Sequence, residues 1–290
     1  MIRKVEHIFS PKTPHFVGDG FRVHNFIPSY SQLSQQRMDP FIMLDYNSKY
    51  VFPASEIPKG VGVHPHKGFE TVTIAYHGRV EHGDSSGGGG VIGEGEVQWM
   101  TAGKGVLHKE FHETEWSKTG GLFQMIQLWV NLPAKDKTIS PKYQSVSKET
   151  MQRTVLPDGL GTVEVIAGNY NNVVGAARTF TPIEMYNLKG QKGAQASFKI
   201  PASYNTFLLV VEGNVLLNGR DEVKENHLAL LQNQGEEFTV DIQEDAVVFI
   251  AAGEPINEPI VHYGPFVMNT MQEIEEAIQD FQNGKFGNLN

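Results

Sequence analysis

The stretch HPHKGFE, residues 64–70, places two histidines on either side of a proline and a glutamate four positions after the second histidine. Side chains two positions apart on a β-strand point to the same face, so His64 and His66 can direct both imidazoles at one point. Further along, GVLHKEF repeats this spacing with His108 and Glu110. Two such strands facing each other would supply three imidazoles and one carboxylate.

A donor set of this kind leaves up to two positions open on an octahedral metal. Nitrogen and oxygen donors with open positions suit Fe(II), Mn(II), Ni(II) or Cu(II), and zinc is less favoured because its structural sites are closed and tetrahedral. A single His-x-His pair also occurs on ordinary exposed strands. The second pair, which follows glycine-rich turns, favours a metal site over that alternative.

The composition limits the chemistry of the chain. It contains no cysteine, which excludes disulfides, thiolate zinc sites, iron–sulfur clusters and a cysteine nucleophile. Hydrophobic residues make up 40% and charged residues 20%, a balance typical of domains with packed cores. The formal charge of −9 opposes direct binding to nucleic acid, whose affinity depends on neutralising phosphates.

The beginning of the sequence, MIRKVEHIFSPKTPH, lacks the apolar core of a signal peptide. The longest apolar runs, such as FLLVV at 207–211, are far shorter than the about 20 residues that a membrane span needs. We therefore expect a cytoplasmic protein without a membrane partner.

Short runs rich in β-branched and aromatic residues, separated by glycine clusters, follow one another from Val61 onward. FETVTIAYHG, EVQWMTAGKG and LFQMIQLWV are examples, and their regular spacing predicts antiparallel barrels or sandwiches. The pattern of TVTIAYHGRVEH returns in TFLLVVEGNVLL, which indicates two copies of one small barrel. The polar, proline-bounded text PAKDKTISPK predicts a linker between them.

These patterns predict a metal-binding barrel over residues 1–134, a linker over 135–142 and a second barrel over 143–263. The second barrel is expected to hold no metal, because between residues 178 and 260 the only histidine is His227, which has no partner at a spacing of two.

The C-terminal text NTMQEIEEAIQDFQNGKFG predicts an amphipathic helix. Thr270 and Glu273 fit a capping box, and Gly284 is placed as a C-terminal stop. The apolar residues recur at helical spacing: Ile274, Ala277, Ile278 and Phe281.

The run from HPHKGFE to GVLHKE, residues 64–110, resembles the signature of the pirin family within the cupin superfamily. MDPFIMLDY before it, QLWVNLPAKDK after it and GEPINEPIVHYGPFVMNT near the C-terminus agree with this resemblance, which covers most of the chain. It implies an all-β bicupin, with two jelly-roll barrels in tandem. It also implies that residues 264–290 return to the N-terminal barrel and pack their helix on it.

The resemblance further implies one metal ion, Fe(II) by expectation, with Mn, Ni, Cu, Co and Zn as alternatives. The family's ligand positions fall here on His64, His66, His108 and Glu110. Glu70, at a position that is a ligand in typical cupins, is expected to support the barrel or the ligands instead. Many pirins have arginine where this chain has Lys67, a replacement that loses the planar fork of the guanidinium.

Two functions follow from the resemblance. The first is a quercetin 2,3-dioxygenase-like oxidoreductase that cleaves a flavonol with dioxygen, in which Glu110 acts as ligand or proton acceptor. The second is a non-enzymatic, iron-dependent redox-sensing regulator that binds a transcription factor or a metabolic enzyme through an acidic face. In either case we expect a monomer.

The remaining histidines have simpler interpretations. His77 and His82 flank the turn in HGRVEHG and are expected to be exposed, whereas His112 could share the face of Glu110 and support the site. The glycine run 87–90 lacks the lysine and hydroxyl of a phosphate-binding loop and predicts a β-turn. The large apolar residues near the predicted site are expected to line the barrel interior: Trp99, Met100, Phe123, Met125 and Trp129.

Overall fold

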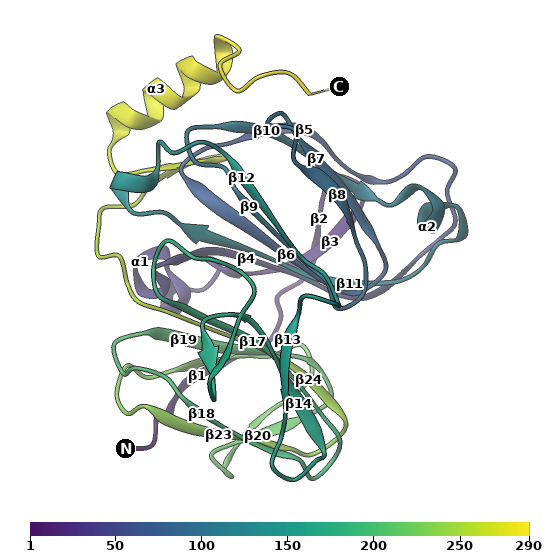
Figure 1. The fold of residues 1–290 in the computed structure, drawn as a ribbon, viewed down its shortest axis with the longest axis vertical. Coiled ribbons are helices and arrows are strands. Elements are labelled where there is room, and N and C mark those ends of the chain that lie inside the picture. The colour runs from purple at the N-terminus through teal and green to yellow at the C-terminus, as the bar shows by residue number, and fades with distance from the viewer. Residues whose placement is uncertain (290) are drawn as a thin grey trace. The chain divides into compact units, whose positions relative to one another are not determined.

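The computed structural model describes residues 1–289 as two compact units, each of them a β-barrel (Figure 1). Residues 13–148 and 256–289 form the first barrel, and residues 1–12 and 149–255 form the second barrel. Strands dominate both units, which confirms the all-β bicupin architecture.

The first barrel consists of a seven-stranded and a four-stranded antiparallel sheet, with a short hairpin of β25 (Val261–Tyr263) and β26 (Phe266–Met268). The larger sheet has the order β12-β9-β6-β11-β4-β3-β2 and the smaller one β5-β10-β7-β8. The strands of the larger sheet are β2 (His15–Val17), β3 (Phe21–Ile27), β4 (Phe41–Phe52), β6 (Phe69–His77), β9 (Val97–Thr101), β11 (Gly121–Asn131) and β12 (Lys142–Val146). Those of the smaller sheet are β5 (Gly60–His66), β7 (Val80–Asp84), β8 (Gly89–Ile92) and β10 (Val106–His112).

The second barrel repeats this construction. Its seven-stranded sheet has the order β1-β22-β19-β24-β17-β14-β13, and its four-stranded sheet has the order β18-β23-β20-β21. The strands are β1 (Val5–Phe9), β13 (Gln152–Val155), β14 (Gly161–Ala167), β17 (Ile183–Gly190), β18 (Gln195–Lys199), β19 (Asn205–Glu212), β20 (Val215–Leu217), β21 (Asp221–Val223), β22 (Leu228–Leu231), β23 (Glu237–Ile242) and β24 (Ala246–Gly253), with a small hairpin of β15 (Asn169–Tyr170) and β16 (Val173–Val174).

The two sheet orders correspond strand by strand, with β6 and β11 matching β19 and β24. The corresponding edge positions are filled by β12 in the first barrel and β1 in the second. The boundaries between the units therefore lie elsewhere than the sequence analysis expects. Residues 1–12 join the second barrel because β1 pairs with β22, and residues 142–146 join the first because β12 pairs with β9.

The segment expected to be a linker is part of the first barrel. It contains the 3-10 turn η2 (Ala134–Asp136), followed by Lys137, which is buried. The Lys137 Nζ donates hydrogen bonds to Gly68 O at 2.7 Å, Asn131 Oδ1 at 2.6 Å and Val267 O at 3.0 Å. An ammonium group with three acceptors fixes this segment, so its polar composition reflects buried hydrogen bonding rather than exposure.

The C-terminal helix α3 (Met271–Gln282; Figure 1) begins with the predicted capping box of Thr270 and Glu273. It belongs to the first barrel, where it contacts β25 and β26. Ile274 and Ala277 are buried against Phe266, and Ile278 is partly buried. Phe281 is 40% exposed, so the predicted apolar face is narrower than expected.

The remaining helical segments are short: η1 (Ser31–Leu33), α1 (Gln35–Met38) and α2 (Thr114–Thr119). Among residues 1–289, no helix has both the length and the apolar character needed to cross a membrane.

Candidate metal centre

The turn between β5 and β6 is held at a defined position. Gly68 has a φ of 89°, and a Cβ at this residue would come within 2.0 Å of Val267 O, so a side chain here would require the backbone to move. The preceding residue, Lys67, donates to Asp280 Oδ2 of α3 at 2.8 Å. Together with Lys137, these contacts fix the strand end that carries His64 and His66.

Three histidines converge inside the first barrel. The register of the smaller sheet places His108 of β10 directly opposite His64 of β5, and His66 lies two positions further along β5. One ring nitrogen from each of the three lies within 4.8 Å of the others. The Nε2 atoms of His64 and His66 are 2.9 Å apart. The spacing rule that predicted this convergence from the sequence is confirmed for the three imidazoles.

The protonation of these histidines suits metal binding. His64 Nδ1 lies 2.8 Å from Gly62 O, and because a carbonyl only accepts, Nδ1 donates its proton there and leaves Nε2 as the ring nitrogen that faces the other histidines. Burial lowers the pKa of His66 well below its ordinary value and that of His108 to about 3, and the neighbouring His64 adds to both effects. Three imidazoles whose nitrogens converge would be satisfied by one shared cation, so the donor set fits a first-row transition metal.

Glu110 lies beside this cluster but is not one of its members. The register slips after His108, so Glu110 is opposite Val61, and its side chain is 3% exposed. Glu110 Oε2 accepts from Gln127 Nε2 at 2.7 Å, and Oε1 accepts from Thr73 Oγ1 at 3.4 Å. The structure thus holds the carboxylate next to the three histidines by two polar neighbours.

A cavity of about 170 Å³ opens between the histidines and the larger sheet. Two of the histidines and Glu110 form part of its wall, and most of the remaining wall is apolar. It is lined by Val17, Phe21, Val23, Met43, Asp45, Val61, His64, His66, Glu110, Met125, Gln127, Trp129 and Pro265. Met125 and Trp129, which are expected from the sequence to line the barrel interior, are walls of this pocket. Trp99 lies on the opposite face of β9 from Gln98, the residue that contacts His108.

A row of polar side chains crosses the interior face of the larger sheet, and three of its members contact His108 or Glu110. Neighbouring members are register partners on five adjacent strands, in the order Asn25, Asp45, Gln127, Thr73 and Gln98. Gln98 Nε2 lies 3.4 Å from His108 Nε2, and Gln127 and Thr73 contact Glu110. We refer to these five residues as the polar layer. The polar layer is not visible in the sequence, because its members are brought together only by strand register.

Glu70 lies outside the cavity wall. It alternates with Phe69 and Thr71 along β6, and its Oε1 accepts from Thr101 Oγ1 at 2.7 Å. Burial raises the pKa of Glu70 to about 7. The Lys67 ammonium is engaged on the side of the C-terminal helix, where it binds Asp280 and lies 5.8 Å from the ring centre of Phe286.

The other histidines of the first barrel differ in their surroundings. His77 is partly exposed beside Glu94, as expected. The prediction that His82 is exposed is wrong: its side chain is buried, its ring stacks on Tyr143, and its Nε2 lies 2.6 Å from the Tyr143 hydroxyl. His112 is also buried, but its Nε2 binds Gly20 O at 2.8 Å, outside the metal cluster.

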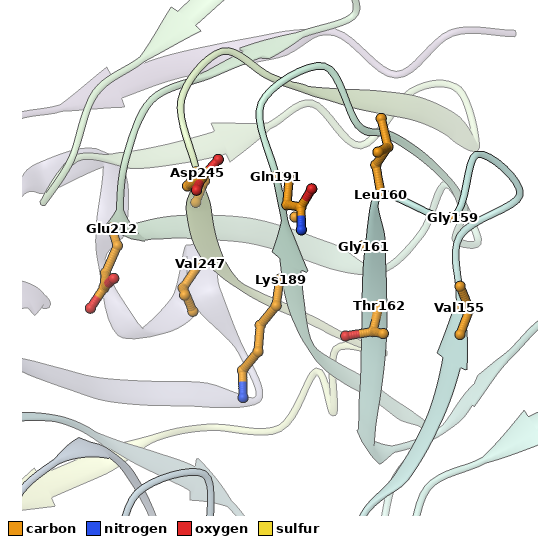
Figure 2. A pocket seen from close by; sticks show the side chains of 12 residues that line it. Val155, Gly159, Leu160, Gly161, Thr162, Lys189, Gln191, Glu212, Asp245 and Val247 are labelled. Carbon is orange, nitrogen blue, oxygen red and sulfur yellow. The ribbon is translucent and has the colours of Figure 1, made fainter.

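Larger clefts occur on the second barrel without a comparable donor set. One of about 490 Å³ is lined by residues of β13, β14, β17, β19 and β24 and of the adjoining turns (Figure 2), and its twelve lining residues include no histidine. Lys189 in this cleft already pairs with Glu164 at 2.9 Å. Within residues 1–289, the three histidines of the first barrel form the one cluster of three or more ligand side chains whose donor atoms converge. The chemistry of the site, rather than cavity size, therefore identifies the candidate centre.

Two similar barrels, one of which carries a histidine cluster, define a bicupin protein with a single candidate metal site. Comparisons with known proteins agree. The Pirin family profile matches residues 20–130, and the profile described as Pirin C-terminal cupin domain matches residues 185–287. The chain belongs to the pirin family.

Several relatives cover nearly the whole chain. A Pseudomonas aeruginosa protein named "Putative quercetin 2,3-dioxygenase" is 42% identical over 98% of this chain and 99% of its own length. A tomato protein named "Pirin-like protein" is 37% identical over 93% of this chain and 88% of its own length.

Solved structures show the same relationship. The crystal structure of a quercetin 2,3-dioxygenase from Acinetobacter baumannii is 46% identical, covers 100% of both chains and has a TM-score of 0.93. A bacterial pirin from Escherichia coli, solved in complex with nickel(II), shares the fold with a TM-score of 0.62 at 20% identity, covering 86% of this chain and 100% of its own.

Proposed function

We propose that this protein is a metal-dependent dioxygenase that cleaves a flavonol such as quercetin. The observation that carries the proposal is the convergence of His64, His66 and His108, with nitrogens within 4.8 Å, at the wall of a mainly apolar cavity. The names of the similar proteins from Pseudomonas aeruginosa and Acinetobacter baumannii support the same substrate class. We propose Fe(II) as the metal.

The proposed ligands are His64, His66, His108 and Glu110. A divalent metal held by these groups would supply Lewis acidity and redox chemistry at positions open to a substrate and dioxygen. The chain's own contribution is to hold the imidazoles in place through the burial of His66 and His108, which lowers their pKa, and through the hydrogen bond from His64 to Gly62 O. Glu110, oriented by Gln127 and Thr73, takes one of two roles, fourth ligand or acceptor of a substrate proton.

The cavity size limits how a flavonol would bind. A volume of about 170 Å³ is below the about 300–1,000 Å³ typical of sites that enclose a drug-sized ligand. The hydroxy-ketone end of a flavonol would enter beside the histidines, and its remaining rings would extend through the mouth of the cavity. Trp129, whose ring lies 5.3 Å from that of His66, offers an aromatic wall for the part that enters.

Turnover tests this proposal directly. Metal-free protein is loaded anaerobically with Fe(II), Mn(II), Ni(II), Cu(II) or Co(II), mixed with quercetin and exposed to dioxygen. Loss of the visible quercetin absorbance together with release of carbon monoxide is expected with at least one metal. Metal-free protein is the control. The absence of turnover with every metal would contradict the proposal and favour the regulator function that the family resemblance also implies.

A further inference from the structure

Asp45 is a carboxylic acid in the cavity wall that does not support the three histidines or Glu110. It follows Met43 on the same face of β4 and lies between Asn25 and Gln127 in the polar layer. Gln127, Thr73 and Gln98 each contact a proposed ligand, whereas Asp45 is held from the other side, where its Oδ1 accepts from Asn25 Nδ2 at 2.7 Å. Its presence is therefore not explained by orienting the metal ligands.

The surroundings of Asp45 make an acid at this position costly. The same cavity wall contains Phe21, Val23, Met43 and Met125, and an ionised carboxylate is poorly solvated among apolar side chains. Burial raises the pKa of Asp45, and the hydrogen bond from Asn25 and the nearby His15 act against this effect. A half-buried acid whose carboxylate accepts from the neutral Asn25 side chain, in a cavity that also contains a candidate metal site, is a candidate for a functional role.

Glu110 is less suited to exchange a proton. Both of its oxygens accept hydrogen bonds from the polar layer, and it is also the proposed fourth ligand. A carboxylate that binds a metal and accepts two further hydrogen bonds has little capacity left for a substrate hydroxyl. Asp45 lies in the same small cavity, so a ligand that fills the cavity can contact it while approaching His64 and His66.

We propose that Asp45 is the catalytic proton acceptor of this pocket for an enolic or phenolic substrate whose hydroxyl binds beside the histidines. The substrate O–H bond breaks, its electron pair stays on the substrate oxygen, and the proton forms a new bond to an oxygen of the Asp45 carboxylate. The proton returns to the product before it leaves, so no other reactant is consumed in this step. The inference rests on the proposed function for the metal site and the substrate class, and it leaves Glu110 as a ligand.

The test separates ionisation of a substrate from its oxidation. Protein loaded with Ni(II) is titrated without oxygen with 3-hydroxyflavone in weakly buffered solution that contains a pH indicator. The absorbance of the flavonol reports ionisation of its hydroxyl, and the indicator reports whether the proton leaves the protein. With the wild-type protein we expect the ionised form to accumulate with release of well under one proton per bound ligand, because Asp45 retains it.

The variant Asp45→Asn keeps the size of the side chain and an oxygen that can accept from Asn25. It is expected to bind the same amount of metal, but to ionise the ligand only at higher pH and with release of one proton. Asp45→Glu should restore proton retention in part. Asp221→Asn, the same substitution on β21 of the second barrel, is the matched control and should behave as the wild type.

The inference is overturned if Asp45→Asn matches the wild type in both readouts. It is also overturned if this variant loses its metal, since Asp45 would then support the metal site, or if the wild-type protein does not ionise 3-hydroxyflavone. A failed proposed function gives a different result. Wild-type protein would then ionise and retain the proton as expected, yet produce no carbon monoxide from quercetin when dioxygen is admitted with any of the metals.

Discussion

The two barrels have corresponding sheet orders but different interiors. In the four-stranded sheet of the first barrel, the register partners His64 and His108 place their ring centres 5.4 Å apart. In the corresponding strands of the second barrel, the register partners Phe198 and Phe238 stack at 5.2 Å. The same pairing of strands thus holds a cluster of donor atoms in one barrel and a close-packed apolar core in the other.

The larger sheets show the same contrast. In the second barrel, a row in register across β14, β17, β24 and β19 consists of Val163, Leu188, Val248 and Val210, all buried in the core. The matching strands of the first barrel carry four members of the polar layer. Burying polar side chains stabilises a fold less than burying aliphatic ones, so the interior of the first barrel is better explained by function than by stability.

The largest effects are expected where a histidine of the first barrel is removed. His64→Ala or His108→Ala should lower the bound metal from about one equivalent to near zero, with loss of at least about 1,000-fold in any quercetin turnover, because the metal supplies the reactive centre. Metal analysis after dialysis measures this. His227→Ala in the second barrel is the matched control and should retain both metal and turnover. Variants of His64 and His108 that each retain a full equivalent of metal would contradict the ligand assignment.

A substitution in the core of the second barrel should lower stability without changing the metal content. Phe198→Ala removes a buried ring from its core and should lower the free energy of unfolding by about 3–5 kcal/mol. Chemical denaturation measures this loss, and the metal content under native conditions should stay at the wild-type value. If Phe198→Ala lost its metal but kept its stability, the assignment of the metal site to the first barrel and of a stabilising apolar core to the second would be wrong.

Glu70 provides a test through pH. Burial raises its pKa from 4.5 to about 7, so the folded protein holds this proton over a range in which the unfolded chain has released it. The resulting contribution to stability is present in full below about pH 4.5 and is lost as the pH rises to about 7, for a difference of about 3 kcal/mol. Glu70→Gln should flatten this dependence and keep the metal. Thermal unfolding of both proteins between pH 4.5 and 8 measures this pH dependence of stability. Loss of the metal from Glu70→Gln would instead indicate that Glu70 is a ligand.

The smallest effect is expected at Lys137, which joins the turn after His66 to the hairpin of β25 and β26. Lys137→Met leaves Gly68 O and Val267 O without their donor and should lower the free energy of unfolding by about 2 kcal/mol. The metal should also dissociate faster in a competition assay with a chelator. Lys135→Met is the control, because it makes the same substitution at a nearby lysine whose side chain is exposed. Equal stability of the two variants would show that the buried ammonium is dispensable.

The sequence predicted those features that depend on short spacings. The convergence of His64 and His66 follows from the period of a strand, and the capping box of α3 follows from a spacing of three residues. The polar layer could not be predicted in this way, since Asp45 and Gln127 are 82 positions apart and meet only through the register of β4 and β11.

Two local interpretations failed for a related reason. His82 flanks a turn and therefore suggested exposure, but the aromatic ring that covers it comes from Tyr143, 61 positions away. Lys137 lies in a polar, proline-bounded segment that suggested a linker, but its charge is enclosed by carbonyl oxygens from β26 and the turn at Gly68. Local composition does not reveal a partner that arrives from a distant strand.

Anomalous X-ray diffraction from crystals of the iron-loaded protein tests the central claim most directly. The account predicts one iron peak per chain, located about 2 Å from the converging nitrogens of His64, His66 and His108, and no iron peak in the second barrel. A peak away from these histidines, a second peak in the other barrel, or no peak in protein shown to contain iron would contradict it.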